Sequence, residues 1–273
     1  MEIFIAFIFG TLLGSFLNVV ILRIPKDESV VFPSSYCYSC GSKLRAWHNI
    51  PILSWLFLGG KCGFCKTKIS IQYPLVELAS GLLAAMLVYK YQVVSIPLIS
   101  IYLSFLMLLA LSMIDLKYKM VPDSLNILAI IFAVLGAWSI EAGMQNLQNA
   151  LLFAGGFTLL RFMLSYYLTS RAHRFYKKTE TSWNRHYHRY PFIEAMGEGD
   201  IMVAATMGAL LGIKLTLFAI FLSALLALPI LLMVQNRSAE EQRVPFVPFL
   251  AMATLIVFVL DSPILDYLNR LYA

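Results

Sequence analysis

The chain has 273 residues, of which 60% are hydrophobic and only 13% are charged. Soluble domains carry roughly 25% charged residues, so the composition excludes an ordinary water-soluble protein and indicates a membrane protein. The net charge of +6 does not indicate nucleic-acid binding, because the basic residues fall in loops between apolar segments, where membrane topology already requires them.

Apolar runs of about 20 residues recur along the chain, which is the length that an α-helix needs to cross the hydrocarbon of a bilayer. We therefore predict an all-α polytopic membrane protein with about eight transmembrane helices. The predicted spans are 3–22, 75–92, 96–114, 124–140, 147–168, 200–213, 215–234 and 248–262. The first span is expected to be a retained anchor, because Glu2 stands where a signal peptide would carry basic residues.

Lysine and arginine residues predict the orientation, because the cytoplasmic loops of membrane proteins are enriched in them. Seventeen of the 21 basic residues lie in alternate connections between the predicted spans, namely 23–72, 115–123, 169–199 and 235–247. We expect these segments in the cytoplasm and the N-terminus outside. The expected domains are a first transmembrane helix at 1–22, a small cytoplasmic domain at 23–74 and a transmembrane domain at 75–273, which includes the cytoplasmic loop 169–199.

The small cytoplasmic domain contains two C-x-x-C pairs. Their members are Cys37 and Cys40, and Cys62 and Cys65. Paired knuckles of this kind suit structural zinc, which takes two thiolates from each tight turn. A reducing compartment argues against two disulfides, and redox-active or inert thiols remain as alternatives. Four sulfur ligands leave no open position for a catalytic water, so the zinc is expected to fold the loop only.

Two aspartates stand at span ends that the predicted topology places on the same face. Asp115 closes the third span in LLALSMIDLKYKMVPD, and Asp200 opens the sixth in MGEGDIMVAATMG. Because the sixth span is short, either the bilayer thins locally or Asp200 lies below the membrane surface. Gly197 and Gly199, just before it, allow close backbone approach, so an extended substrate could lie there. Two carboxylates about 3 Å apart share one proton, and such a pair can activate water and polarise a peptide carbonyl, as in aspartic proteolysis.

Helix capping is the alternative interpretation of these acids. An acid at the position of Asp200 gains from the dipole of the helix that it opens, whereas Asp115, at a C-terminal end, does not. Asp123, which follows a proline in VPDSL, is interpreted as an N-cap or an acid early in a helix. Glu194 and Glu198, which flank the second acid, are expected on a solvated loop face.

Five stretches carry a resemblance to a known family. They are GSFLNVVILRIP at 14–25, the segment from Cys37 to Glu77, IDLKYKMVPD, GEGD, and VPFVPFLAMA at 244–253. Together, and in this order, they resemble the opening helix, the cysteine-bearing domain, the two aspartate motifs and the late proline–phenylalanine motif of the bifunctional type IV prepilin peptidases, which are GxGD-type membrane aspartic proteases.

The resemblance implies an enzyme with two activities. One is an aspartic endopeptidase that cuts the basic leader of type IV prepilins and pseudopilins after a glycine at the cytoplasmic membrane face. The other N-methylates the new N-terminal residue with S-adenosyl-L-methionine. The resemblance also implies Asp115 and Asp200 as the catalytic pair and a bacterial inner-membrane location. The oligomeric state is not predicted.

The residues that hold the methyl donor are not indicated by any local motif. Glu77 is a weak candidate to contact the donor or the incoming amino terminus, and an interfacial acid is its alternative interpretation. Two departures from the family bear on substrate contacts: Met202 stands where lysine is usual, and the loop 171–198 is longer than common. Two rival hypotheses remain, a proton-coupled transporter and a non-catalytic zinc-loop scaffold of a pilus or secretion assembly.

Overall fold

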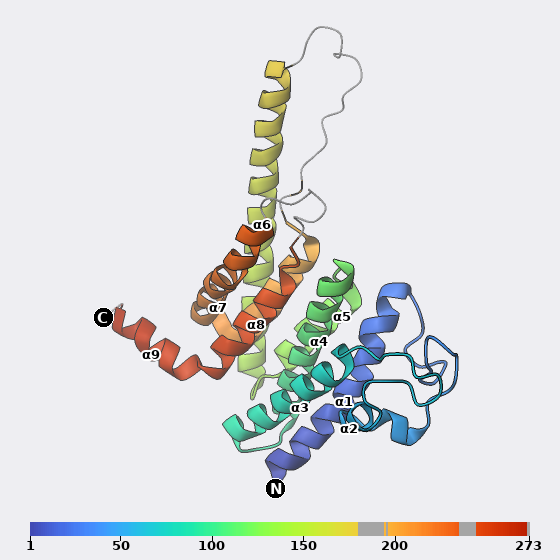
Figure 1. The fold of residues 1–273 in the computed structure, drawn as a ribbon. Helices are drawn as coiled ribbons and strands as arrows, with labels where there is room; N and C mark the ends of the chain where they lie inside the picture. The colour runs from blue at the N-terminus through green and yellow to red at the C-terminus, as the bar shows by residue number, and fades with distance from the viewer. Residues whose placement is uncertain (180–193, 195, 235–243, 272–273) are drawn as a thin grey trace.

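The computed structural model describes residues 1–179, 194, 196–234 and 244–271. The described residues form helices joined by loops, with isolated β-bridges at Tyr36–Lys43 and Lys61–Lys68, so the predicted all-α class is confirmed (Figure 1). The elements are α1 (Glu2–Arg23), η1 (Ile24–Lys26), η2 (Ala46–Asn49), α2 (Leu53–Phe57), α3 (Gln72–Tyr91), α4 (Ile96–Tyr118), α5 (Asp123–Leu135), α6 (Ile140–Thr179), α7 (Glu198–Val234), α8 (Val247–Val259) and α9 (Asp261–Leu271).

The number of membrane spans is lower than predicted when helices are judged by length and composition. Among the described residues, α1, α3, α4, α6 and α7 are long and apolar enough to cross a membrane, and the bent pair of α8 and α9 would make a sixth span. The eight predicted spans are therefore not confirmed. Two of them, 200–213 and 215–234, fall within α7, and α5 has only 13 residues, about 20 Å of helix against about 30 Å of hydrocarbon.

α7 contains a break that length alone does not reveal. Gly212 has φ 71° and ψ −178°, which is not helical. A straight helix from Asp200 to Val234 would be about 51 Å long. The ten residues from Val234 to Val244 reach at most about 36 Å, yet Val244 lines the same cavity as Asp200. The chain must therefore turn back at Gly212, as two antiparallel segments would.

α6 also departs from the prediction, because it continues to Thr179 rather than ending near residue 168. The expected loop 169–199 thus begins as helix. Residues 180–193 and 195 of that loop lie outside the described residues.

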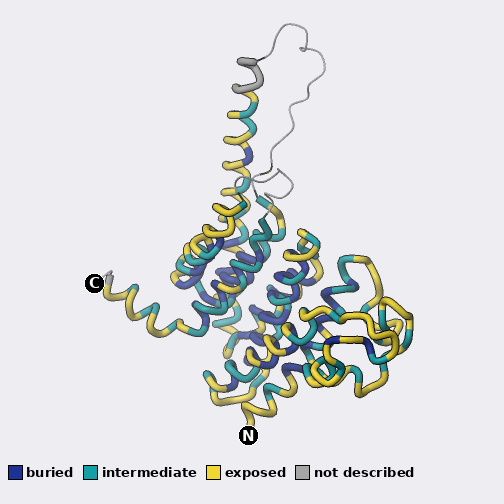
Figure 2. Tube along the Cα trace, viewed as in Figure 1, coloured by how far each residue is buried: buried dark blue, intermediate teal, exposed yellow. Residues whose placement is uncertain are grey.

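A close helix contact joins α1 and α3, which run side by side in Figure 1. A Cβ on Gly14 would lie 2.8 Å from the Cα of Glu77, and a Cβ on Gly10 would lie 2.8 Å from the Cα of Gly81. The Ser80 hydroxyl donates to the Gly10 carbonyl at 2.6 Å across this contact. Buried residues follow the facing sides of these helices and of α4 (Figure 2), so α1, α3 and α4 pack against one another.

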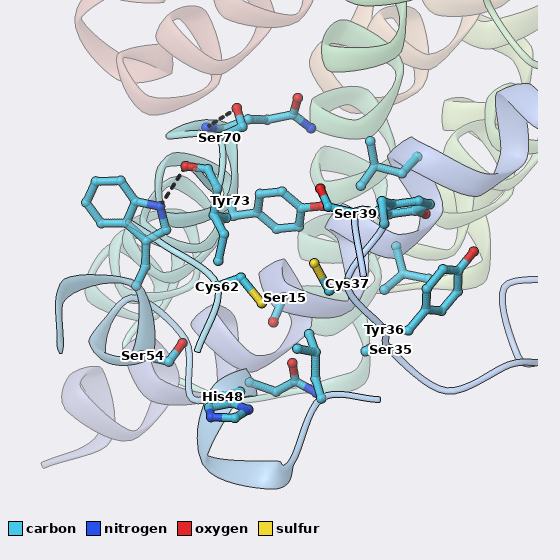
Figure 3. A pocket seen from close by; sticks show the side chains of 18 of the residues that line it. Ser15, Ser35, Tyr36, Cys37, Ser39, His48, Ser54, Cys62, Ser70 and Tyr73 are labelled. Atoms are coloured by element: carbon cyan, nitrogen blue, oxygen red, sulfur yellow. Dashed lines mark hydrogen bonds between the residues drawn. The ribbon is translucent and has the colours of Figure 1, made fainter. Parts of the chain in front are cut away.

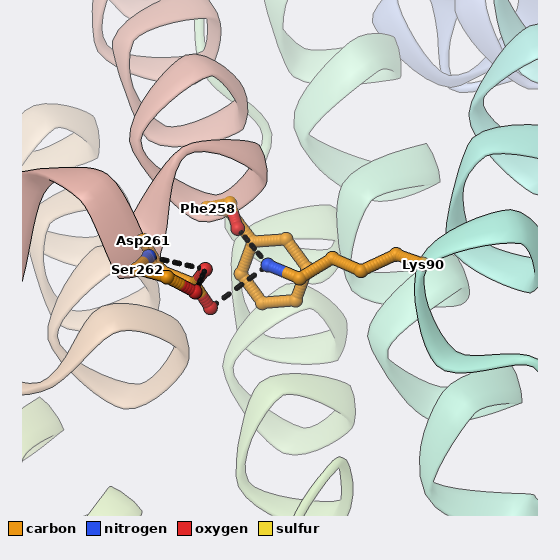
Figure 4. Close-up of polar contacts among 4 residues, drawn as sticks. All are labelled: Lys90, Phe258, Asp261 and Ser262. Atoms are coloured by element: carbon orange, nitrogen blue, oxygen red, sulfur yellow. Dashed lines mark hydrogen bonds and ion pairs between the residues drawn. The ribbon is translucent and has the colours of Figure 1, made fainter.

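The ends of the helices separate two faces of the bundle. In Figure 1 the C-terminal ends of α1, α4 and α6 lie toward the upper side, and the N-terminus and the α3–α4 turn lie toward the lower side. On the lower side, the Lys90 ammonium at the end of α3 pairs with Asp261 at 2.8 Å and donates to the Phe258 carbonyl at 2.5 Å (Figure 4). These contacts fix the corner at which α8 passes into α9, bent by 81°.

We expect Gly14→Ala to lower the free energy of unfolding by about 1–3 kcal/mol, because its methyl group would overpack the α1–α3 contact. Gly155→Ala on α6 is the matched control, since a Cβ there meets nothing within 4 Å. The measurement is thermal unfolding of the purified variants in one detergent. Equal stability of the two variants would contradict the packing described here.

Candidate active site and metal centre

Asp115 lies in the last turn of α4, and its side chain is buried. Its carboxylate accepts a hydrogen bond from the backbone N–H of Val247 at 3.1 Å. Val247 is the first residue of α8, so the acid that closes α4 faces the positive end of another helix. This contact supplies the dipole stabilisation that Asp115 cannot obtain from its own helix.

Asp200 lies in the first turn of α7, directly after the two glycines. A Cβ on Gly199 would lie 2.5 Å from the Cβ of Val121, which is closer than real side chains approach. A Cβ on Gly197 would meet only the Asp200 carboxylate, at an ordinary 3.6 Å. Gly199 is therefore the glycine that allows the start of α7 to press against the α4–α5 connection, and Asp200 is positioned by that approach.

Asp115 and Asp200 line one cavity of about 180 Å³, although 85 positions separate them in the sequence. Lys119, Val121 and Phe246 line it as well. The structure thus brings the two predicted acids together. Asp123 does not belong to the described lining; it is the exposed first residue of α5, which agrees with a place at the helix N-terminus.

Two groups that contact Asp115 were not predicted from the sequence. Lys119, the left-handed C-cap of α4, donates its backbone N–H to the Asp115 carbonyl at 2.9 Å and is among the residues that line the cavity. Its spacing of four residues from Asp115 was the available signal, because residues four apart share a helix face. The Val247 N–H had no such signal, because it comes from backbone 132 positions away.

The arrangement suits a pair of carboxylates that carries one negative charge. Two like charges in one small cavity cannot both ionise cheaply, so such a pair holds a proton between its members and titrates as a unit. The N-termini of α7 and α8 provide positive potential for the remaining charge. A site of this kind can deprotonate a water molecule and protonate a carbonyl oxygen in the same step.

The two acids that flank Asp200 form ion pairs that the sequence did not predict. Arg161, on α6, donates to Glu198 at 2.9 Å and lies 3.4 Å from Glu194. Both acids were expected on a solvated loop face, and they are indeed exposed. Exposed ion pairs of this kind contribute about 0–1 kcal/mol to stability. They connect α6 with the start of α7 and are not part of the cavity.

The four cysteines form a cluster on the loop between α1 and α3. Their sulfur atoms all lie within 4.8 Å of one another, and those of Cys37 and Cys65 are 3.8 Å apart. A tetrahedral zinc site with Zn–S bonds of about 2.3 Å requires sulfur atoms about 3.8 Å apart, so the cluster fits such an ion. Hydrogen bonding to Thr67 lowers the pKa of the Cys65 thiol to about 6, which favours the thiolate that a metal requires. The cluster can therefore bind a metal.

Each cysteine pair sits on a tight turn. The N–H of Gly41, at φ 70°, donates to the Cys37 carbonyl at 2.8 Å. The N–H of Lys66, at φ 60°, donates in the same way to Cys62 at 3.1 Å. The left-handed residue closes each turn and points both sulfur atoms of a pair to one side, which is why the sequence spacing predicted the cluster correctly.

Glu77 lies away from the paired aspartates. It is buried on α3 and accepts a hydrogen bond from the backbone N–H of Ile52 at 2.6 Å. It lines a second, larger cavity and does not belong to the described lining of the first. The structure therefore separates this candidate from Asp115 and Asp200.

The helical membrane architecture, two acids in one cavity and a cysteine cluster together define a class of membrane protein. Comparison with known proteins identifies this class. Residues 8–91 match the bacterial peptidase A24 N-terminal domain, and residues 102–232 match the type IV leader peptidase family. The chain is similar to the prepilin leader peptidase/N-methyltransferase of Neisseria gonorrhoeae, at 32% identity over 97% of this chain and 93% of that protein. It is also similar to the one of Pseudomonas aeruginosa, at 31% identity over 96% and 90% of the two chains.

The chain therefore belongs to the type IV leader peptidase family. No solved structure matches it.

We expect the purified protein to carry one tightly bound divalent metal ion, and Cys62→Ser to lose it, because three remaining thiolates no longer close the tetrahedron. Ser39→Ala, in the first knuckle but without a ligand atom, is the control and should retain the ion. Elemental analysis after extensive dialysis measures the metal content. Full retention in Cys62→Ser would show that the cluster is not the binding site.

Proposed function

We propose that this chain is a membrane aspartic endopeptidase that removes the leader of prepilins and pseudopilins and then N-methylates the new amino terminus. The observation that carries the proposal is the shared cavity of Asp115 and Asp200. The names of its relatives, prepilin leader peptidase/N-methyltransferase, support the same two activities. They do not favour the transporter or the non-catalytic scaffold.

The cleavage step follows from the single proton that the acids share. The ionised carboxylate removes a proton from a water molecule, whose oxygen attacks the peptide carbonyl carbon. The protonated carboxyl donates its proton to the carbonyl oxygen, and a tetrahedral diol forms. The proton taken from water then passes to the leaving nitrogen as the C–N bond breaks. The other carboxylate takes a proton back from one hydroxyl of the diol as that hydroxyl becomes the new carbonyl, and the pair returns to its singly protonated state. The N-termini of α7 and α8 limit the build-up of negative charge during these transfers.

The orientation proposed for the chain places the cavity and the cysteine loop in or at the cytoplasm of a bacterial inner membrane, with the N-terminus outside. The enrichment of basic residues in alternate connections supports this orientation. The grouping of the ends of α1, α4 and α6 on one side of the bundle agrees with it. In this orientation residues 23–74 would form a cytoplasmic insertion between α1 and α3. We therefore propose domain boundaries at residues 22 and 74.

The metal proposed for the cysteine cluster is zinc, in a structural role. Four thiolates with no other ligand are typical of structural zinc, and they leave no position at which water or substrate can bind the ion. The methyl donor proposed is S-adenosyl-L-methionine, which supplies an electrophilic methyl group for the amine exposed by cleavage.

Asp115→Asn and Asp200→Asn are each expected to lower the rate of leader cleavage by about 10²–10⁴-fold or more, because either change removes a proton-transfer partner. Asp123→Asn changes an exposed acid outside the cavity and should cleave at the wild-type rate. The assay is mass spectrometry of a prepilin incubated with purified protein. Undiminished cleavage by either cavity variant would refute the catalytic assignment.

Gly199→Ala is expected to reduce cleavage by about 100-fold, because its methyl group would push the start of α7 away from Val121 and displace Asp200. Gly197→Ala is the matched control, two residues earlier, and should keep most of its activity, since its added methyl group makes only an ordinary contact. The same prepilin assay measures both. Similar losses in the two variants would show that close approach at Gly199 does not position the acid.

A further inference from the structure

The short helix α2 lies in the cysteine loop between α1 and α3, and one of its sides faces the larger cavity. That cavity has a volume of about 600 Å³, and Ser54 of α2 and Ser15 of α1 both line it (Figure 3). The Trp55 indole of α2 donates to the Ile69 carbonyl at 3.2 Å, which connects the helix to the end of the loop. One side of α2 is therefore covered by the protein itself.

The other side of α2 is apolar and uncovered. Leu53, Leu56 and Phe57 are three and four positions apart, so they share one face of the helix. Trp47 and Ile50 precede them, and all five side chains have between 46% and 86% of their surface exposed. Large exposed apolar surfaces of this kind mark contacts with a membrane or with another protein. These five residues together are the α2 patch.

The start of α2 lies at the depth of the apolar part of α1. The Ile52 N–H donates to the Glu77 carboxylate at 2.6 Å, and a Cβ on Gly14 would lie 2.8 Å from the Glu77 Cα. Gly14 precedes Arg23, the end of α1, by nine residues, which is about 13 Å of helix. The hydrocarbon of one leaflet is about 15 Å thick, so Ile52 lies within one side-chain length of a level that lipid tails surround.

The first cysteine knuckle, in contrast, lies at the charged end of α1. The Arg23 guanidinium is over the Tyr36 ring at 5.8 Å, and the Lys26 ammonium is over the Tyr38 ring at 5.2 Å. Lys26 is exposed and follows the last helical turn. The loop thus extends from the level at which the first span ends down to the level of Glu77.

The charge of the loop suits a membrane surface. Residues 29–76 contain five basic residues and no acidic residue; the five are Lys43, Arg45, Lys61, Lys66 and Lys68. Arg45 and Lys61 are exposed and flank the α2 patch in the sequence. The cytoplasmic surface of a membrane carries anionic lipids that attract such basic segments. The apolar patch and the charge around it therefore fit the same partner, whereas an aqueous protein partner would leave the depth of α2 unexplained.

We propose that the α2 patch is immersed in the leaflet at which α1 ends, with its side chains among lipid tails and the flanking basic residues at anionic headgroups. At five residues, α2 is far too short to cross a bilayer, so the chain enters and leaves on the same side. The cysteine knuckles stay on the aqueous side and are held at the membrane surface by this contact. The inference goes beyond the proposed function, because it requires neither cleavage nor methylation.

A photoreactive side chain tests the immersion directly. In the full chain, reconstituted in liposomes of phosphatidylethanolamine and phosphatidylglycerol, p-benzoylphenylalanine replaces either Phe57 or Tyr38. Both are exposed aromatic residues of the same loop, and Tyr38 is the matched control at the end of α1. We expect phospholipid adducts at position 57 to exceed those at position 38 by about tenfold or more, because lipid tails surround only position 57. Mass spectrometry of the peptides measures the adducts, and equal yields at the two positions would overturn the inference.

The unsubstituted chain provides an independent measurement. A diazirine dissolved in the lipid tails should label residues 53–57 of the wild-type protein in the same liposomes and leave residues 36–43 unlabelled. Absence of label from 53–57, while the exposed side of α1 is labelled, would refute immersion whether or not the photoreactive variants fold.

A protein partner is the competing occupant of the patch. Cross-links from position 57 to a second copy of this chain, or to added prepilin, in place of lipid adducts would assign the patch to that protein and refute the lipid contact. Asp115→Asn separates the inference from the proposed peptidase, because it should lose cleavage and keep the wild-type diazirine labelling of residues 53–57. Retained cleavage in that variant would refute the peptidase assignment and leave the labelling result intact.

Discussion

The candidate active site requires that Asp115 and Asp200 lie in one cavity, although their carboxylates repel each other. Asp115 ends one helix and Asp200 begins another, so neither helix alone could create the pair. The start of α8 donates the Val247 N–H to Asp115, and the start of α7 carries Asp200, so the positive ends of two helices lie at the shared charge. Close backbone contact at Gly199 then sets the separation of the acids, because any side chain there would force the helices apart.

The sequence predicted the parts of this site that follow from periodicity and short spacing. Counting apolar segments placed Asp115 and Asp200 on one face, and the C-x-x-C spacing predicted the cysteine cluster. Both predictions use local rules: a helix that crosses the bilayer reverses the side of the chain, and two cysteines on one tight turn point the same way. The all-helical class was predicted from the apolar composition and from apolar runs as long as a helix that crosses a bilayer.

Other features depend on contacts between distant segments and could not be predicted. The Val247 N–H reaches Asp115 only after α7 has turned back at Gly212, and no hydropathy window distinguishes that turn from a continuous helix. The span count differed for a related reason, since α5 is shorter than an independent span and packs within the bundle. The large cavity has no sequence signature, because α1, α3, α4 and the cysteine loop each contribute part of its wall.

One turn of α4 borders both cavities: Asp115 and Lys119 line the smaller one, and Lys117 and Tyr118 line the larger one. Their walls are therefore mechanically linked through this turn. A displacement of the end of α4 would change the shape of both cavities together, so that neither could be remodelled without an effect on the other.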